Sequence, residues 1–153
     1  PSLCWGQSEP KLTSTHKDWV VYVYDEGAGK VCYMLSAALE SSPEIGGRAE
    51  SVVTVTHRPS ASIKNEIGVI AGYDYQIGAS VNAIVDTKTF EFFSQGDGAW
   101  LRTVEEESEM VADMKKGRRL AVVGISLDGS TTTDKYSLLG FTAAHRAISK
   151  ACF

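Results

Sequence analysis

The placement of the cysteines limits the folds open to this chain more than any other sequence feature. Cys32 lies within a short apolar stretch, and Cys152 lies on the last turn of a predicted helix, one residue from the end. Cys4, in contrast, lies in an unpatterned stretch near the start, where we expect an unpaired or intermolecular thiol. We therefore predict a Cys32–Cys152 disulfide, which would close most of the domain into one loop and require an oxidising compartment.

Length and composition predict one ordinary folded domain. The chain has 153 residues, 43% of them hydrophobic and 22% charged. Fifteen basic and nineteen acidic residues give a net charge of -4 with no basic stripe, which argues against a nucleic-acid partner. No apolar run is long enough for a transmembrane segment. We expect a flexible segment at 1–17 and a single domain at 18–153. Because the chain starts at Pro1, we also expect a processed or trimmed precursor, and the first residues could be what remains near a signal-peptide cleavage site.

Short runs of β-branched and aromatic residues between turn signals predict strands. These runs are 19–24, 31–35, 51–57, 66–71, 80–86, 89–94, 99–102, 120–125 and 132–138. Two segments have helical periodicity instead. The first follows Thr103, which forms a capping box with Glu106, and closes at Gly117; the second runs from about Phe141 to Ala151. We predict a mainly β fold: an antiparallel β-sandwich with a short helix in a late connection and a C-terminal helix.

No residue pattern indicates an enzyme or a metal centre. His16, His57 and His145 are far apart in the sequence, and none has a second ligand at metal-binding spacing. The run Gly27-Ala-Gly-Lys30 lacks the first glycine of a phosphate loop, and Val31 stands where Ser or Thr would bind magnesium. We therefore predict no catalytic, cofactor-binding or metal-binding residues and no cofactor.

A contact surface is the one binding feature that the sequence favours. We expect it around Trp100, with Arg58, Asp97 and Arg102 nearby, because Trp and Arg dominate binding hot spots. The turn before Trp100 is rich in glycine, which would leave the indole accessible. The alternative is that Trp100 fills the interior of the sandwich while Asp97 forms an internal ion pair with Arg58 or Arg102.

A series of short motifs also occurs in order along nearly the whole chain. They are Asp18-Trp19, Val31-Cys32-Tyr33, Val55-Thr-His-Arg-Pro59, Ala71-Gly-Tyr73, Gly96-Asp-Gly-Ala-Trp100, Met114-Lys-Lys-Gly117, Tyr136-Ser-Leu, Gly140-Phe-Thr-Ala-Ala144 and Lys150-Ala-Cys152. Taken together, they resemble the invasion-associated locus B family from about Asp18 to Cys152. Many members carry a cysteine shortly after the Trp of the first strand, whereas Val20–Tyr24 contains none, so the chain is similar to the branch with only the later cysteine pair.

The resemblance implies a fold, a location and a class of function. Members are exported proteins of Gram-negative bacteria with an immunoglobulin-like β-sandwich and no established catalytic activity, and some are linked to entry into host cells. We therefore expect an exported, non-catalytic virulence protein that is periplasmic, secreted or associated with the outer membrane. Its expected partner is a host-cell or bacterial envelope protein. The alternatives are a periplasmic envelope-maintenance or stress factor and, less favoured, an unrecognised hydrolase.

Overall fold

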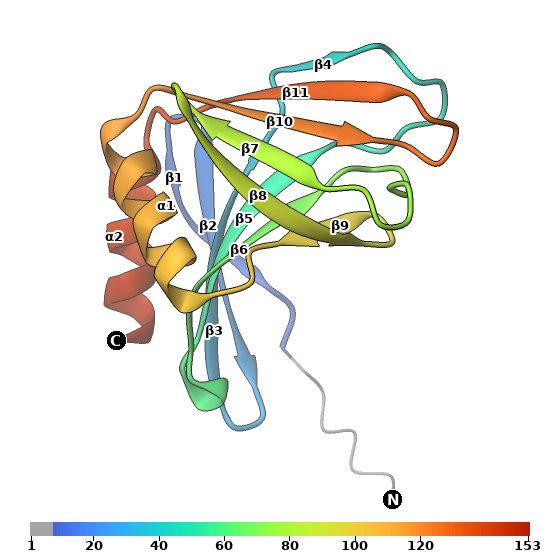
Figure 1. Cartoon of the computed structure of the whole chain (residues 1–153). Coiled ribbons are helices and arrows are strands. Elements are labelled where there is room, and N and C mark those ends of the chain that lie inside the picture. The colour runs from blue at the N-terminus through green and yellow to red at the C-terminus, as the bar shows by residue number, and fades with distance from the viewer. Residues whose placement is uncertain (1–7) are drawn as a thin grey trace, which may run out of the picture.

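Eleven antiparallel strands form one continuous, open sheet in the computed structural model, which describes residues 8–153 (Figure 1). The strands are β1 (Lys11–His16), β2 (Trp19–Glu26), β3 (Gly29–Ala37), β4 (Glu40–Ser42), β5 (Val52–Arg58), β6 (Ile63–Ile70), β7 (Val81–Val85), β8 (Lys88–Gln95), β9 (Gly98–Trp100), β10 (Arg119–Ile125) and β11 (Thr131–Ser137). The helices are the 3-10 helix η1 (Pro59–Ala61), α1 (Val104–Lys116) and α2 (Phe141–Cys152). The order of the strands across the sheet is β1-β2-β3-β5-β6-β9-β8-β7-β10-β11-β4.

The sheet changes partners along β8, and this divides it into two halves. Residues Lys88–Phe92 of β8 pair with β7, whereas Phe93–Gln95 pair with β9. The first half therefore contains β1, β2, β3, β5, β6 and β9, and the second half contains β7, β10, β11 and β4. In Figure 1 the second half crosses over one end of the first.

This pairing corrects the expected immunoglobulin-like sandwich of two separate sheets. Because β8 is long enough to pair with strands of both halves, the hydrogen-bonded ladder continues from one half into the other. The mainly β character, the helix in a late connection and the C-terminal helix are as predicted. The strand runs predicted from β-branched and aromatic residues all fall within or beside strands of the structure.

One core lies between the two halves and the helices. Strand side chains alternate between buried and partly exposed positions, and the buried ones from both halves belong to a single cluster that includes residues of α1 and α2. The predicted apolar stripe of α2, Phe141, Ala144 and Ile148, is fully buried. Phe141 meets Trp19 of β2 edge to face, with ring centroids 5.1 Å apart. The C-terminal helix thus covers the inner face of the first half.

Thr103 is the N-cap of the first helix as predicted, and its hydroxyl donates to the Glu106 carboxylate in place of the second bond of a capping box. Thr103 accepts a hydrogen bond from the backbone N–H of Glu106, which satisfies a donor at the helix start. Glu107, in the same turn, accepts a hydrogen bond from the backbone N–H of Ile67 on β6 at 3.0 Å. The acidic first turn therefore stabilises the helix and also fastens it to the first half of the sheet.

The N-terminal region is more ordered than expected. Within the segment 1–17, which we expected to be flexible, Lys11–His16 form β1 and pair with β2 at the edge of the sheet. The sequence gives little sign of this strand, because Leu12 is its only large apolar residue and the alternation of apolar and polar residues that marks a half-buried strand is missing. In the structure, Leu12 is exposed. Residues 1–7, and with them Cys4, lie outside the described part of the chain.

The predicted disulfide between Cys32 and Cys152 is present. It joins β3 to the last turn of α2, which are 120 residues apart in the sequence. A stable disulfide of this kind indicates a location outside the cytoplasm. It also keeps the end of α2 on the first half of the sheet.

Replacing both cysteines, Cys32→Ser and Cys152→Ser, should lower the free energy of unfolding by up to about 4–5 kcal/mol, because an unfolded chain without the cross-link gains the entropy of a very long loop. Urea unfolding of the double variant against the unreduced protein measures the loss. Cys4→Ser is the matched control and should leave stability nearly unchanged. Peptide mapping without reduction that finds Cys32 or Cys152 as a thiol would contradict the prediction.

Candidate functional site

The side of the first half that faces away from the helices carries a row of apolar and aromatic side chains. Strand pairing places six residues side by side across six strands, four of them apolar or aromatic and two, in the middle, a threonine and a glycine: Val20, Leu35, Thr54, Gly68, Trp100 and Phe93. Tyr22, Tyr24 and Tyr33 lie on the same side of β2 and β3. Except for Gly68, all of these residues are partly exposed, in contrast to the alternate residues that fill the core. We call this surface the outer face.

Trp100 lies flat against the outer face rather than in the core. A Cβ atom on Gly98 would overlap the indole ring, and one on Gly68, the cross-strand neighbour, would lie 3.1 Å from the indole Nε1. Only glycines at these positions leave room for the ring to lie on the backbone. Trp100 is partly exposed and does not belong to the core cluster. The alternative in which it fills the interior is therefore not what the structure shows.

Phe93 and Arg102 extend the surface beside Trp100. The ring centroids of Phe93 and Trp100 are 6.1 Å apart, and the guanidinium of Arg102 lies 5.0 Å from the centroid of Phe93. These three side chains, which we call the Trp100 cluster, combine a fixed aromatic surface with one exposed cation. Trp100 and Arg102 are thus brought together as predicted, through a phenylalanine that the sequence analysis did not single out.

Arg58 belongs to a second group of aromatic residues on the same face. Its guanidinium donates hydrogen bonds to the Tyr24 hydroxyl at 3.3 Å and to Glu26 at 3.1 Å. Tyr33 stacks on Tyr22 with centroids 5.3 Å apart, and its edge meets Tyr24 at 6.3 Å. We call these three tyrosines the tyrosine cluster. The alternation of Tyr22 and Tyr24 along β2 is a signal that the sequence offers. Their contacts with Tyr33, in contrast, depend on the register between β2 and β3.

The predicted contact residues are therefore only partly gathered. β5 and β6 separate the tyrosine cluster on β3 from Trp100 on β9, so the two clusters lie roughly 14 Å apart across the strands. Asp97 is exposed in the turn between β8 and β9, where its carbonyl accepts a hydrogen bond from the N–H of Ala71. Among the described residues, Asp97 forms no ion pair, and Arg58 is paired with Glu26 instead.

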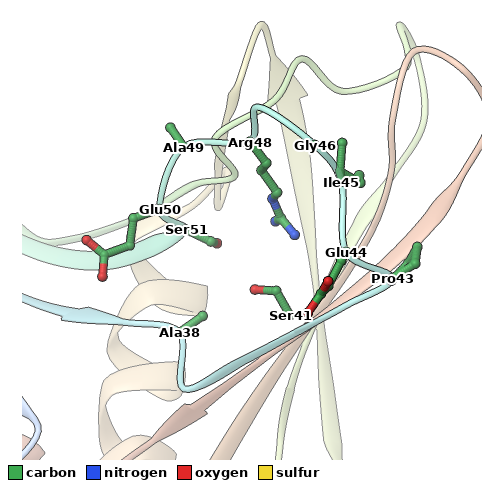
Figure 2. A pocket seen from close by; sticks show the side chains of 10 residues that line it. All are labelled: Ala38, Ser41, Pro43, Glu44, Ile45, Gly46, Arg48, Ala49, Glu50 and Ser51. Atoms are coloured by element: carbon green, nitrogen blue, oxygen red, sulfur yellow. The ribbon is translucent and has the colours of Figure 1, made fainter.

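A hollow of about 360 Å³ lies elsewhere, between β4 and the loop that leads to β5. Figure 2 shows the side chain of Arg48 pointing from this loop into the hollow, with Ser41 facing it from the other side and Glu50 turned away. The residues that line it are Ala38, Ser41, Pro43, Glu44, Ile45, Gly46, Arg48, Ala49, Glu50 and Ser51. Sequence reasoning did not identify this hollow, because no motif marks its residues.

Arg48 links three parts of the fold beside this hollow. Its Nη2 forms an ion pair with Asp134 of β11 at 2.6 Å, and its Nε donates to the carbonyl of Ala71 at 2.9 Å. The guanidinium also lies over the ring of Tyr73, 4.7 Å from the centroid. The side chains of Arg48 and Asp134 are only 7% and 2% exposed. Because Asp134 already neutralises the charge of Arg48, the role of Arg48 is better explained as holding the loop in place than as binding an anion.

The structure brings together two of the histidines that are far apart in the sequence. His57 of β5 and His145 of α2 lie beneath the helix with ring centroids 5.4 Å apart, whereas His16 of β1 hydrogen-bonds to Ser14. Within residues 8–153, no group of three His, Cys, Asp or Glu side chains is arranged to hold a metal ion. Neither described helix is both long enough and apolar enough to cross a membrane.

Arg48→Ala should lower the free energy of unfolding by about 3–5 kcal/mol, because it leaves the carboxylate of Asp134 buried without a counter-charge. The double variant Arg48→Met with Asp134→Leu should recover a large part of this loss, since it removes both charges. Urea unfolding of the three proteins provides the test. A loss below about 1 kcal/mol for Arg48→Ala would show that the pair does not hold the loop in place.

Comparison with known proteins agrees with the motifs along the chain. A family model described as "Invasion associated locus B (IalB) protein" matches residues 19–149, from the start of β2 into the last turn of α2. The matched region contains the whole outer face and two buried polar clusters, the Arg48–Asp134 pair and the His57–His145 pair. No curated protein and no solved structure gives a significant match. Because the family match covers most of the chain, this protein belongs to the invasion-associated locus B family.

Proposed function

We propose that this protein is an exported, non-catalytic binding protein that acts in host-cell association or invasion by contacting a host-cell surface protein through its outer face. Family membership supports the invasion-associated role, and the Cys32–Cys152 disulfide supports a location in the periplasm, on the outer membrane or outside the cell. The observation that carries the proposal is the presence of two aromatic clusters on the side of the sheet opposite both helices.

The outer face has the chemistry of a protein-binding hot spot. Tryptophan, tyrosine and arginine are enriched at the centres of interfaces, where they bury a large area. Trp100 is already held in one orientation by Gly68 and Gly98, so little side-chain entropy is lost when a partner covers it. The tyrosine cluster is likewise ordered by stacking and by its hydrogen bond to Arg58. The surface is therefore preorganised before a partner arrives.

The geometry of the polar residues supports a non-catalytic role. Arg48, the cation beside the hollow, is paired with Asp134. The ring nitrogens of His57 and His145 hydrogen-bond to Asn65 and to the Ser149 hydroxyl, and both rings are buried. A catalytic histidine instead needs a substrate within hydrogen-bond reach, and burial beneath α2 keeps a substrate from these two rings. Broad hydrolase screens of the purified protein should therefore stay at background.

Trp100→Ala combined with Arg102→Ala should weaken binding to host cells about tenfold or more, because the change removes the centre of the proposed surface. The fold should persist, since neither side chain belongs to the core cluster. Flow cytometry with labelled protein measures binding, and thermal unfolding checks the fold. The matched control is Ile77→Ala, which removes a side chain that is 93% exposed in the loop between β6 and β7.

Cross-linking in living bacteria, with and without host cells, identifies what the surface contacts. Capture of a host protein by the native chain but not by the Trp100 and Arg102 double variant supports the proposal. Capture of a bacterial envelope protein alone would favour the envelope-maintenance alternative. A folded double variant that binds host cells as well as the native chain would rule out the outer face as the contact surface.

A further inference from the structure

A pair of buried histidines lies where α2 packs on the sheet. His57 is fully buried on β5, and His145 is 7% exposed on α2. Their ring planes meet at 77°, so the edge of one imidazole approaches the face of the other. Phe153, next to the end of α2, lies against His57 with ring centroids 5.0 Å apart. The pair therefore forms part of the contact that keeps the C-terminal half of the helix on the sheet.

Hydrogen bonds require the His57 imidazole to be neutral and hold His145 to the same neighbour, Asn65. The backbone N–H of Asn65 donates to Nδ1 of His57 at 3.1 Å, so this nitrogen cannot carry a hydrogen. The hydrogen of His57 is consequently on Nε2, which lies 3.1 Å from the Ser149 hydroxyl of α2. Nε2 of His145 lies 2.7 Å from the side-chain oxygen of Asn65 and donates to it. Asn65 thus connects both histidines, one through its backbone and one through its side chain.

The surroundings oppose a positive charge on either ring. The nearby charged groups are Lys64 on β6, Lys115 on α1 and, on the exposed side of α2, Arg146 and Lys150. On β3, Cys32 is held in the disulfide and does not titrate. Burial, followed by the charge of Lys64, lowers the pKa of His57 from 6.5 to about 4. Burial, followed by Lys115 and then by His57 and Lys64, lowers the pKa of His145 to about 4 as well.

We propose that α2 is an acid-sensitive latch in which protonation of His57 and His145 releases the C-terminal half of the helix from the sheet. A proton on Nδ1 of His57 would face the N–H of Asn65, which removes that hydrogen bond and replaces it with repulsion. Two imidazolium rings at this spacing also repel each other. The disulfide at Cys152 keeps the released segment tethered to β3, so the opening is local and reversible.

The direction of the pH effect follows from proton binding. When the latch opens, the imidazoles reach water and regain their ordinary pKa of 6.5, so the open state binds more protons than the closed state between about pH 4 and 6.5. The closed latch is therefore fully stable above about pH 6.5 and loses stability as the pH falls through this window. Opening would expose Ile148, which is fully buried in the closed state, giving an apolar surface that is present only in acid.

Hydrogen exchange of α2 between pH 7 and 4.5, corrected for the intrinsic exchange rate, tests the latch in the intact, unreduced protein. In the native chain, we expect protection of the C-terminal half of α2 to fall at least about tenfold over this range, while β5 and β6 stay protected. The double variant His57→Gln with His145→Gln keeps a donor and an acceptor at each position but cannot titrate. It should show the same α2 protection at both pH values.

His16→Gln is the matched control, because it removes a histidine outside the pair and should leave the acid response unchanged. Unchanged α2 protection in the native chain at pH 4.5, or equal opening in the double Gln variant, would overturn the proposal. If that variant does not fold, NMR titration of the native imidazoles decides instead. Midpoints for His57 and His145 well below 6.5 that coincide with α2 opening support the latch, and titration of either ring without opening refutes it.

Discussion

The burial of one face of a bent sheet is the constraint on which the rest of this structure depends. β8 pairs with strands of both halves, so the sheet folds over its own inner face, and α1 and α2 cover the part that the second half leaves open. The strands that line the core must therefore direct alternate apolar residues inward in register. The residues between them face outward, and this alternation creates the outer face with its two aromatic clusters.

Two buried polar clusters hold parts of the structure together in different ways, one at the joint between the loop before β5 and β11 and one at the joint between α2 and the sheet. Arg48 and Asp134 form a buried charged pair that joins the loop before β5 to β11, and removing one partner would leave the other charge buried and unpaired. Beneath α2, His57 and His145 are buried as neutral rings. The stability of the Arg48–Asp134 contact depends on the presence of both charges. The stability of the His57–His145 contact depends on both rings remaining neutral. In the proposed latch, the second joint therefore responds to acid.

The outer face and the latch lie on opposite sides of the first half. Trp100 and the tyrosine cluster face away from the core, whereas α2 and the histidines lie on the inner face. Contact through the outer face therefore does not require α2 to move. An acidic environment would change the inner side only, and the disulfide, which joins the last residue of α2 to β3, would keep that change local. The fold thus separates the proposed binding surface from the proposed acid-dependent apolar one.

The sequence by itself determined the elements and the family. Residue type and periodicity placed both α-helices and all strands except β1 and β4. The apolar settings of Cys32 and Cys152 predicted the disulfide, and the ordered motifs identified the family. These features depend on neighbours within a few residues or on residue identity alone. Tertiary structure decided the rest: the continuous sheet, the edge strand β1, the separation of Arg58 from Trp100, and the meetings of Arg48 with Asp134 and of His57 with His145. Each of these depends on strand order and register between distant segments, which local patterns do not encode.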